Sequence, residues 1–101
     1  MDYIYIDDAV DAAVLAMESG RFGEVYNAGT SVPTNIRQLT ALMLKIAQKN
    51  IKQVYGPKDI THGTSRVADI TKIKKLLGWE PKVALEQGLK QTYNWLSSTK
   101  P

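Results

Sequence analysis

The stretch "DYIYIDDAVDAAVLAM", residues 2–17, joins two periodicities, and this junction decides the predicted fold. Its first half alternates aromatic and aliphatic side chains with a period of two, which is typical of a β-strand. Its second half has the spacing of an amphipathic helix, predicted over Ala9 to Ser19. The apolar residues of that helix recur three or four positions apart, which places them on one face: Val10, Ala13, Val14 and Met17.

Two adjacent carboxylates, Asp7 and Asp8, stand where the strand pattern gives way to the helix pattern. Paired acids beside aromatic residues can be catalytic, can hold a metal ion, or can start a helix. A carboxylate at a helix start accepts hydrogen bonds from free amides and is stabilised by the helix dipole. We therefore predict that Asp7 or Asp8 is the N-cap of the helix.

The rest of the chain continues the alternation of short strands and helices. The segments "EVYNAG" (24–29) and "IKQVYG" (51–56) are predicted strands. With the strand of the opening stretch they give about four helices and three short strands in a single domain, residues 1–101. Such alternation predicts an α/β (mixed α+β) fold.

Local signals mark the ends of the three later helices. Asn35 is followed three positions later by Gln38, which is the spacing of a capping box. Thr71 is the predicted cap of the next helix, which ends at Gly78, and Trp79 is expected to fold back onto it. The last helix is predicted to begin near Leu85.

Composition narrows the possible classes of protein. The 101 residues include 44% hydrophobic and 23% charged residues and no cysteine, so the chain is a globular domain without disulfides or thiolate metal sites. No apolar run approaches the roughly 20 residues that span a bilayer, and we expect a cytoplasmic protein without membrane contact. The net charge of +3 comes from dispersed lysines without interleaved aromatic residues, which disfavours nucleic acid as a partner.

Three segments carry a resemblance to a known family: "DYIYIDDAVDAAVLAM", "VYNAGTSVPTNIRQL" and "ADITKIKKLLGWEPKVALEQGLKQTYNWL". In this order they resemble the C-terminal third of the extended short-chain dehydrogenase/reductases. The match is to the NAD-dependent nucleotide-sugar epimerases and dehydratases of the UDP-glucose 4-epimerase type. The resemblance implies a C-terminal substrate-binding part without its Rossmann domain.

The motifs that this family uses for catalysis are missing from the sequence. Members bind NAD through a Gly-rich turn at a helix N-terminus and react through a Tyr-x-x-x-Lys pair. No G-x-G-x-x-G or G-x-x-G-x-x-G occurs, and none of the five tyrosines has a lysine four positions later. We expect no catalytic residues, no metal and no cofactor bound by this chain alone, with NAD belonging to the full-length family, so enzyme activity is an open question.

The resemblance also implies substrate-binding residues. Asn27 matches a strand-end asparagine that contacts the nucleotide sugar in some members, with the alternative that it only turns the chain before Gly29. The family's Arg-x-Gly-Asp loop is replaced by "GPKDITHGTSR", where Lys58 or Arg66 can substitute as the phosphate donor. The arginine that precedes the opening stretch in the family is replaced by Met1. We therefore expect weak binding of a nucleotide sugar.

Two functions follow from these expectations. The chain is either the nucleotide-sugar-binding portion of an epimerase or dehydratase, not catalytic alone, or a free-standing, non-catalytic binding or assembly module derived from that family. Without a covering domain, strand edges and helix faces would be exposed, and a two-fold homodimer would cover them. That homodimer is expected to bury the first helix near Val10, Val14 and Met17.

Overall fold

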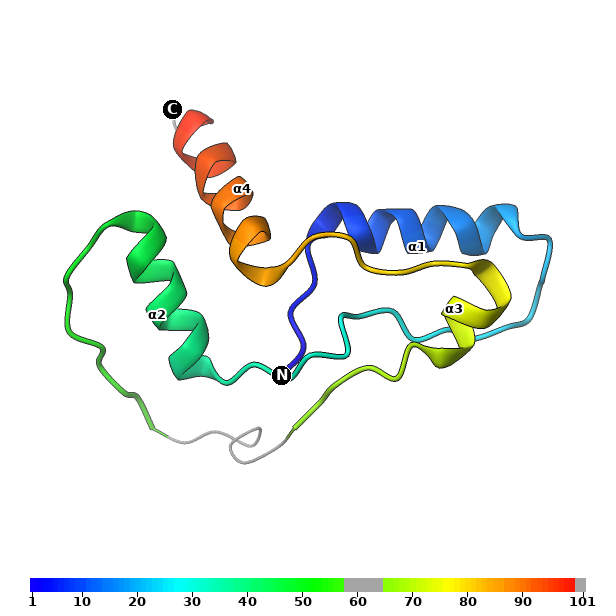
Figure 1. Ribbon diagram of the computed structural model, residues 1–101, viewed down its shortest axis with the longest axis horizontal. Helices are drawn as coiled ribbons and strands as arrows, with labels where there is room; N and C mark the ends of the chain where they lie inside the picture. Colours follow the sequence, from blue (N-terminus) through cyan, green and yellow to red (C-terminus); the bar gives the residue numbers. More distant parts are fainter. Residues whose placement is uncertain (58–64, 100–101) are drawn as a thin grey trace.

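The computed structural model describes residues 1–57 and 65–99 (Figure 1). The helices in this part of the chain are α1 (Ile6–Glu18), α2 (Ile36–Ala47), α3 (Thr71–Leu77) and α4 (Leu85–Ser98). α1 and α3 lie in one half of an elongated molecule of 48 × 35 × 22 Å, and α2 and α4 lie in the other half. The segment that leads into α1 runs between the two halves, so it can contact both.

The three predicted strands are absent from the described residues, so the α/β prediction is wrong for this part of the chain. Residues 1–5 and 24–29 do not form a ladder with each other. One backbone pair joins two of the extended segments: the amide of Thr34 donates to the carbonyl of Met1 over 2.9 Å, and the Met1 nitrogen donates back over 3.1 Å. A strand needs a row of such bonds to a neighbour, so a strand pattern without a neighbour gives only an extended segment.

The face of α1 that is buried in the protein lies opposite its apolar row. Its buried residues are Asp8 and Ala12, and Ala12 packs with Ile73 of α3 and with Trp79 to form the small core. The apolar row is exposed, with Val10 at 49% and Met17 at 72% of full exposure. The row therefore lies on one face of α1, as predicted, and nothing in the described residues covers it. Whether a second copy of the chain covers this face stays a prediction.

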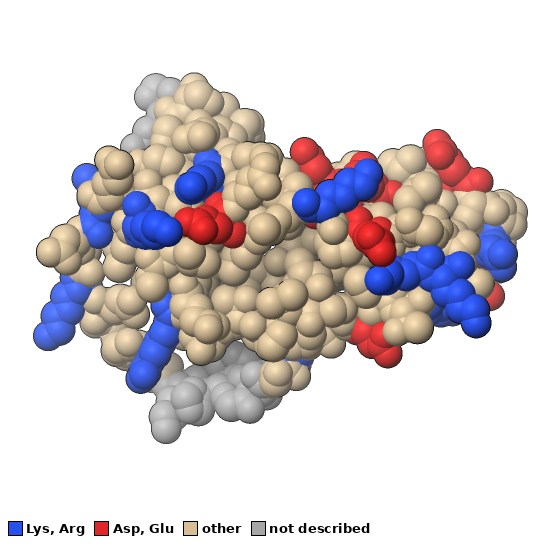
Figure 2. All heavy atoms as spheres, viewed as in Figure 1, with Lys and Arg blue, Asp and Glu red and all other residues tan. Residues whose placement is uncertain are grey.

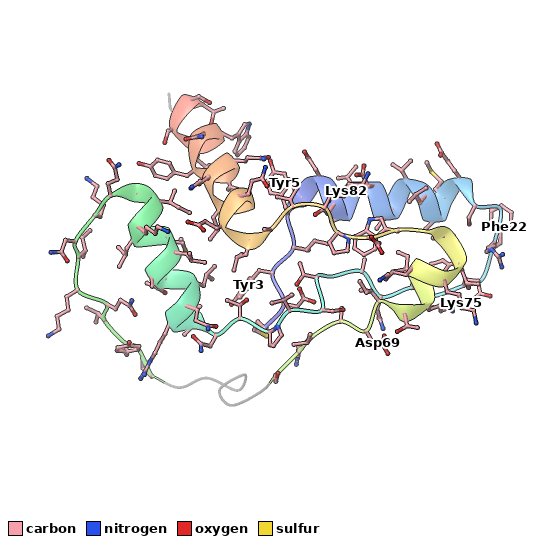
Figure 3. All side chains as sticks on the ribbon, viewed as in Figure 1. Tyr3, Tyr5, Phe22, Asp69, Lys75 and Lys82 are labelled. Atoms are coloured by element: carbon pink, nitrogen blue, oxygen red, sulfur yellow. The ribbon has the colours of Figure 1, made fainter. Side chains whose placement is uncertain are left out.

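The prediction that Asp7 or Asp8 caps α1 is also wrong. The helix begins one residue after Tyr5, which is its N-cap and makes no side-chain capping bond. The Asp8 carboxylate is buried and accepts hydrogen bonds from the amides of Lys82 (3.1 Å) and Val83 (3.0 Å), on the connection between α3 and α4 (Figure 3). The Asp8 carbonyl accepts a further bond from the indole nitrogen of Trp79 at 3.0 Å. Asp8 thus ties α1 to the chain before α4.

The locally encoded ends of the other helices follow the sequence closely. Asn35 and Gln38 form the predicted capping box at the start of α2, and α4 begins at Leu85 as predicted. Gly78 ends α3 in the left-handed conformation, and Trp79 is buried beside it. The predicted cap of α3 is wrong by one position.

Thr71 is the first helical residue of α3 and follows Ile70 as the N-cap. The Thr71 hydroxyl donates to the carboxylate of Asp69, so this threonine still helps to start the helix. In the other half of the molecule α2 packs against α4, and Lys45 forms an ion pair with Glu86 at 2.9 Å across them.

Two helices end on a residue with a left-handed backbone conformation. Glycine adopts this conformation without strain, whereas a residue with a side chain does not. Gly78 has a φ of +68°, whereas Gln48 after α2 has a φ of +56° with a side chain attached. We expect Gln48→Gly to raise the free energy of unfolding by about 0.5–1 kcal/mol and Gly78→Ala to lower it by about 1 kcal/mol. Urea denaturation measures both. Gly56→Ala is the control, since this glycine has no positive φ, and an equal loss there would contradict the explanation.

Candidate functional site

The carboxylate of Asp2 joins two segments that are far apart in the sequence. It accepts hydrogen bonds from the amide and the hydroxyl of Thr30 and from the amide of Ser31 on one side. On the other side it accepts from the amide of Ala68 at 3.2 Å. The amide bonds from Thr30 and Ser31 measure 2.9–3.0 Å, so both carboxylate oxygens are occupied.

Gly29 allows these two segments to approach each other. A Cβ atom at this position would lie 2.6 Å from Oδ2 of Asp2 and 2.7 Å from the Cβ of Ala68. These distances are far below van der Waals contact, and Gly29 does not have a positive φ. The glycine is therefore required by close packing and not by an unusual backbone conformation.

The joined segments form the walls of a cavity of about 530 Å³ that is open to solvent. Asn27 lines it from the first segment and Arg66 from the second, so the structure brings these two predicted site residues together. Asp2 and Asp69 also line it. Lys58, the third predicted residue, lies outside the described residues. No cluster of three metal-ligating side chains occurs within residues 1–57 and 65–99.

Hydrogen bonds determine the charge state of the two carboxylates in this cavity. Partial burial acts to raise the pKa of Asp2, but bonds from the Thr30 hydroxyl and from the amides of Thr30, Ala68 and Ser31 outweigh it and lower that pKa. Bonds from the hydroxyl and amide of Thr71 lower the pKa of Asp69 (Figure 3). Both groups are therefore negative at neutral pH, and Arg66 lines the same cavity as these two carboxylates.

Ser31 holds a strained position at the edge of the site. Its φ of +63° lies in the left-handed region, which a residue with a side chain rarely adopts. Its hydroxyl donates to the carbonyl of Ala68 at 2.7 Å, and its amide donates to Asp2. Backbone strain of this kind is retained only where the surroundings enforce it, and here the contacts with Asp2 and Ala68 do so.

Sequence reasoning missed Asp2 as part of this site. The signal available was an acid directly before an alternating apolar run, but an adjacent pair of acids, Asp7 and Asp8, is the more prominent feature of the same stretch. The reason for Gly29 was missed as well, because the close approach of Asp2 and Ala68 is not visible in the sequence.

Comparison with protein families identifies the group to which the chain belongs. The family described as GDP-mannose 4,6 dehydratase matches residues 1–92. The chain belongs to this family. This confirms the predicted relationship to the nucleotide-sugar epimerases and dehydratases.

Individual members of the family share this portion of the sequence. UDP-glucose 4-epimerase of Mycolicibacterium smegmatis is 36% identical over 92 residues, which cover 90% of this chain and 29% of that protein. UDP-glucuronate 4-epimerase of Thermodesulfobacterium geofontis is 32% identical over 94 residues, covering 93% of this chain and 29% of that protein. The chain spans between 28% and 31% of the length of the curated relatives it matches.

Solved structures of family members have the same arrangement. UDP-glucose 4-epimerase of Thermotoga maritima, solved with UDP-glucose, superposes with a TM-score of 0.89 at 44% identity, over 97% of this chain and 31% of that one. UDP-glucuronic acid 4-epimerase of Bacillus cereus, solved with UDP-glucuronic acid and NAD, gives a TM-score of 0.87 at 29% identity, over 98% of this chain and 32% of that one.

The lowered pKa of Asp2 makes stability depend on pH. A carboxyl group whose pKa is lower in the folded than in the unfolded state stabilises the fold above its ordinary value of 3.8, and this contribution is lost as the pH falls through the folded-state value. We expect Asp2→Asn to lower the free energy of unfolding at pH 7 by roughly 1–3 kcal/mol. The difference from the wild type should shrink below about pH 4.

Urea denaturation of both proteins from pH 7 to pH 3 measures this difference. Hydrogen bonds with Lys72 and Lys45 lower the pKa values of Glu24 and Glu86, so both proteins retain some acid sensitivity. Only the difference between them reports on Asp2. A difference that stays constant with pH would contradict the assignment.

Proposed function

We propose that this chain is the C-terminal, nucleotide-sugar-binding portion of an NAD-dependent nucleotide-sugar epimerase or dehydratase. The observation that supports this most is the cavity of about 530 Å³ in which Asn27 and Arg66 face the same space. An amide and a guanidinium are the groups expected to bind a nucleoside diphosphate linked to a sugar. Two relatives in the family are solved with UDP-glucose and with UDP-glucuronic acid.

Within this proposal each residue has a distinct task. The guanidinium of Arg66 provides a charge-assisted contact to a phosphate oxygen, and the side-chain amide of Asn27 binds a hydroxyl or carbonyl group of the ligand. Lys58 is proposed as a second cation. The carboxylates of Asp2 and Asp69 weaken the attraction of the cavity for an anion. We therefore propose that the isolated chain binds a nucleotide sugar only weakly.

The chain alone is proposed to be non-catalytic and to leave NAD to the remainder of the full-length enzyme. NAD needs a helix N-terminus with free amides beside a Gly-rich turn. In the described residues α1 has Asp7 and Asp8 in its first turn, and α2 is closed by its own capping box. α4 has Glu86 in its first turn. These helix starts do not fit a pyrophosphate, so hydride transfer requires residues that this chain does not provide.

The exposed face of α1 favours a second candidate, a binding or assembly module. Four apolar side chains lie along that face, all more than one-third exposed: Ile6, Val10, Val14 and Met17. Acidic side chains gather beside them over α1, whereas lysine and arginine predominate over the half that contains α2 (Figure 2). A contiguous apolar face of this kind usually marks an interface. For the chain on its own we propose a two-fold homodimer through α1.

Ligand binding can be tested residue by residue. We expect UDP titrated into the isotope-labelled chain to shift the amide and side-chain resonances of Asn27 and Arg66, with a dissociation constant in the millimolar range. Arg66→Gln should weaken binding about tenfold or more, because a charge-assisted hydrogen bond is lost. Arg37→Gln in α2 is the matched control, because this arginine lies over the ring of Tyr55 and does not line the cavity. NAD should give no saturable response, and shifts confined to Lys45 of α2 and to Lys49 and Lys52 after it would overturn the site.

Assembly can be tested by sedimentation at several protein concentrations. We expect a monomer–dimer equilibrium that Val14→Asp moves toward the monomer, because a charge would be buried in the α1 interface. Raised salt should favour the dimer, since it screens the acids that line this face. Thr40→Asp on α2 is the control. A single monomeric species up to millimolar concentration would exclude the homodimer.

A further inference from the structure

We infer that Asp2 is a positioning residue that fixes the separation of Asn27 and Arg66 across the cavity. The geometric part of this inference stands on the hydrogen bonds of Asp2, and its consequence for ligand binding rests on the proposed function. Asp2 need not contact the ligand, because its oxygens already accept bonds from both walls.

The connection from Asp2 to each site residue is short. Asn27 is two residues before Gly29, and the next residue, Thr30, donates to Asp2 through both its amide and its hydroxyl. Arg66 is two residues before Ala68, whose amide donates to the same carboxylate. A shift of either segment relative to Asp2 therefore moves the corresponding side chain, because only one or two residues intervene.

Few other contacts hold these two segments together. Among the described residues, the other hydrogen bond between residues 27–31 and 65–69 is the one from the Ser31 hydroxyl to the Ala68 carbonyl. Neither segment is part of a β-ladder that would fix its place. Among the described residues, the carboxylate accepts five of the six hydrogen-bond contacts that join the three segments. Without it, only the bond from the Ser31 hydroxyl to the Ala68 carbonyl connects residues 27–31 to residues 65–69.

Charge and position make opposite predictions for a variant at Asp2. Asp2 and Asp69 are both carboxylates that line the cavity, and removal of either lowers the repulsion of an anionic ligand. Within residues 1–57 and 65–99, however, Asp69 bonds only to Thr71 two residues later and joins no distant segments. If charge alone mattered, both substitutions would tighten the binding of UDP. If Asp2 positions the site, Asp2→Asn weakens the binding of UDP, whereas Asp69→Asn does not.

The experiment compares the wild-type chain with Asp2→Asn, Asp69→Asn and Gly29→Ala. The first readout needs no ligand: nuclear Overhauser contacts between Gly29 and Ala68, and the pH titration of the amide shifts of Thr30, Ser31 and Ala68. In the wild type these three amides should titrate together with one apparent pKa. In Asp2→Asn the shared titration should vanish and the contacts should weaken, whereas Asp69→Asn should keep both.

The second readout is the affinity for UDP. We expect Asp2→Asn to raise the dissociation constant about tenfold and Asp69→Asn to lower it or leave it within twofold. Asp2→Glu, which keeps the charge on a longer side chain, should restore part of the affinity. Gly29→Ala separates the same segments without changing any charge, since its Cβ would collide with Asp2 and Ala68. It should therefore reproduce the loss even if Asp2→Asn folds poorly.

The two readouts separate the inference from the proposed function. If the wild type does not respond to UDP, the proposed function fails, and the ligand-free contacts still decide whether Asp2 sets the spacing. The positioning role would be overturned if the Gly29–Ala68 contacts were unchanged in Asp2→Asn. It would also be overturned if the three amides of the wild type did not share one titration. Tighter UDP binding by Asp2→Asn would overturn it as well.

Discussion

The carboxylate of Asp2 is the contact on which the central part of the structure depends. Three extended segments meet there, and in the described residues no β-ladder connects them. Regular backbone pairing is replaced by bonds from one side chain to several amides. Hydrogen bonds to a charged group contribute about 1.5–3 kcal/mol each, more than a neutral bond. One acid can therefore hold segments that a sheet would hold with a row of weaker bonds.

The same device recurs between α1 and the chain before α4. Asp8 accepts from two amides, and Trp79 fixes the Asp8 carbonyl with its indole nitrogen. The apolar core beside this contact is small, formed by Ala12, Ile73 and Trp79. If this buried carboxylate lost its amide partners, its desolvation would no longer be compensated and the fold would be destabilised. Two carboxylates of the opening stretch, Asp2 and Asp8, thus position both the site and the helices, which is the physical reason that this stretch determines so much.

Local signals in the sequence were sufficient for several helix ends and insufficient for the start of α1 and for what lies between the helices. The capping box of α2, the left-handed glycine after α3 and the start of α4 are fixed by residues within one or two turns. The strands and the buried face of α1 depend on neighbours, and a period of two or 3.6 says nothing about where a neighbour is. Asp8 was misassigned for the same reason, because its partners, Lys82 and Val83, are distant in the sequence.

The candidate site divides in the same way. Asn27 and Arg66 were identified through the resemblance to a family and not through periodicity, and the structure places them on one cavity. Asp2 and Gly29 had no such match, and their importance lies in a packing distance of 2.6 Å between Asp2 and a Cβ that the glycine lacks. Close approach between segments can be recognised only once the segments are placed. The residues that shape a cavity are therefore harder to predict than those that line it.

The two faces of α1 show why an amphipathic pattern does not identify the partner of a helix. The apolar row satisfies the spacing of a buried face, but the fold uses the opposite row, where Ala12 packs with Ile73 and Trp79. A helix with a packed small face and an exposed large one is suited to lie between two layers. Burial of the exposed face would contribute about 25 cal/mol for each Å² of apolar surface covered. The core within this chain is small, so a surface that covers α1 would supply a large share of the stability of this half of the molecule.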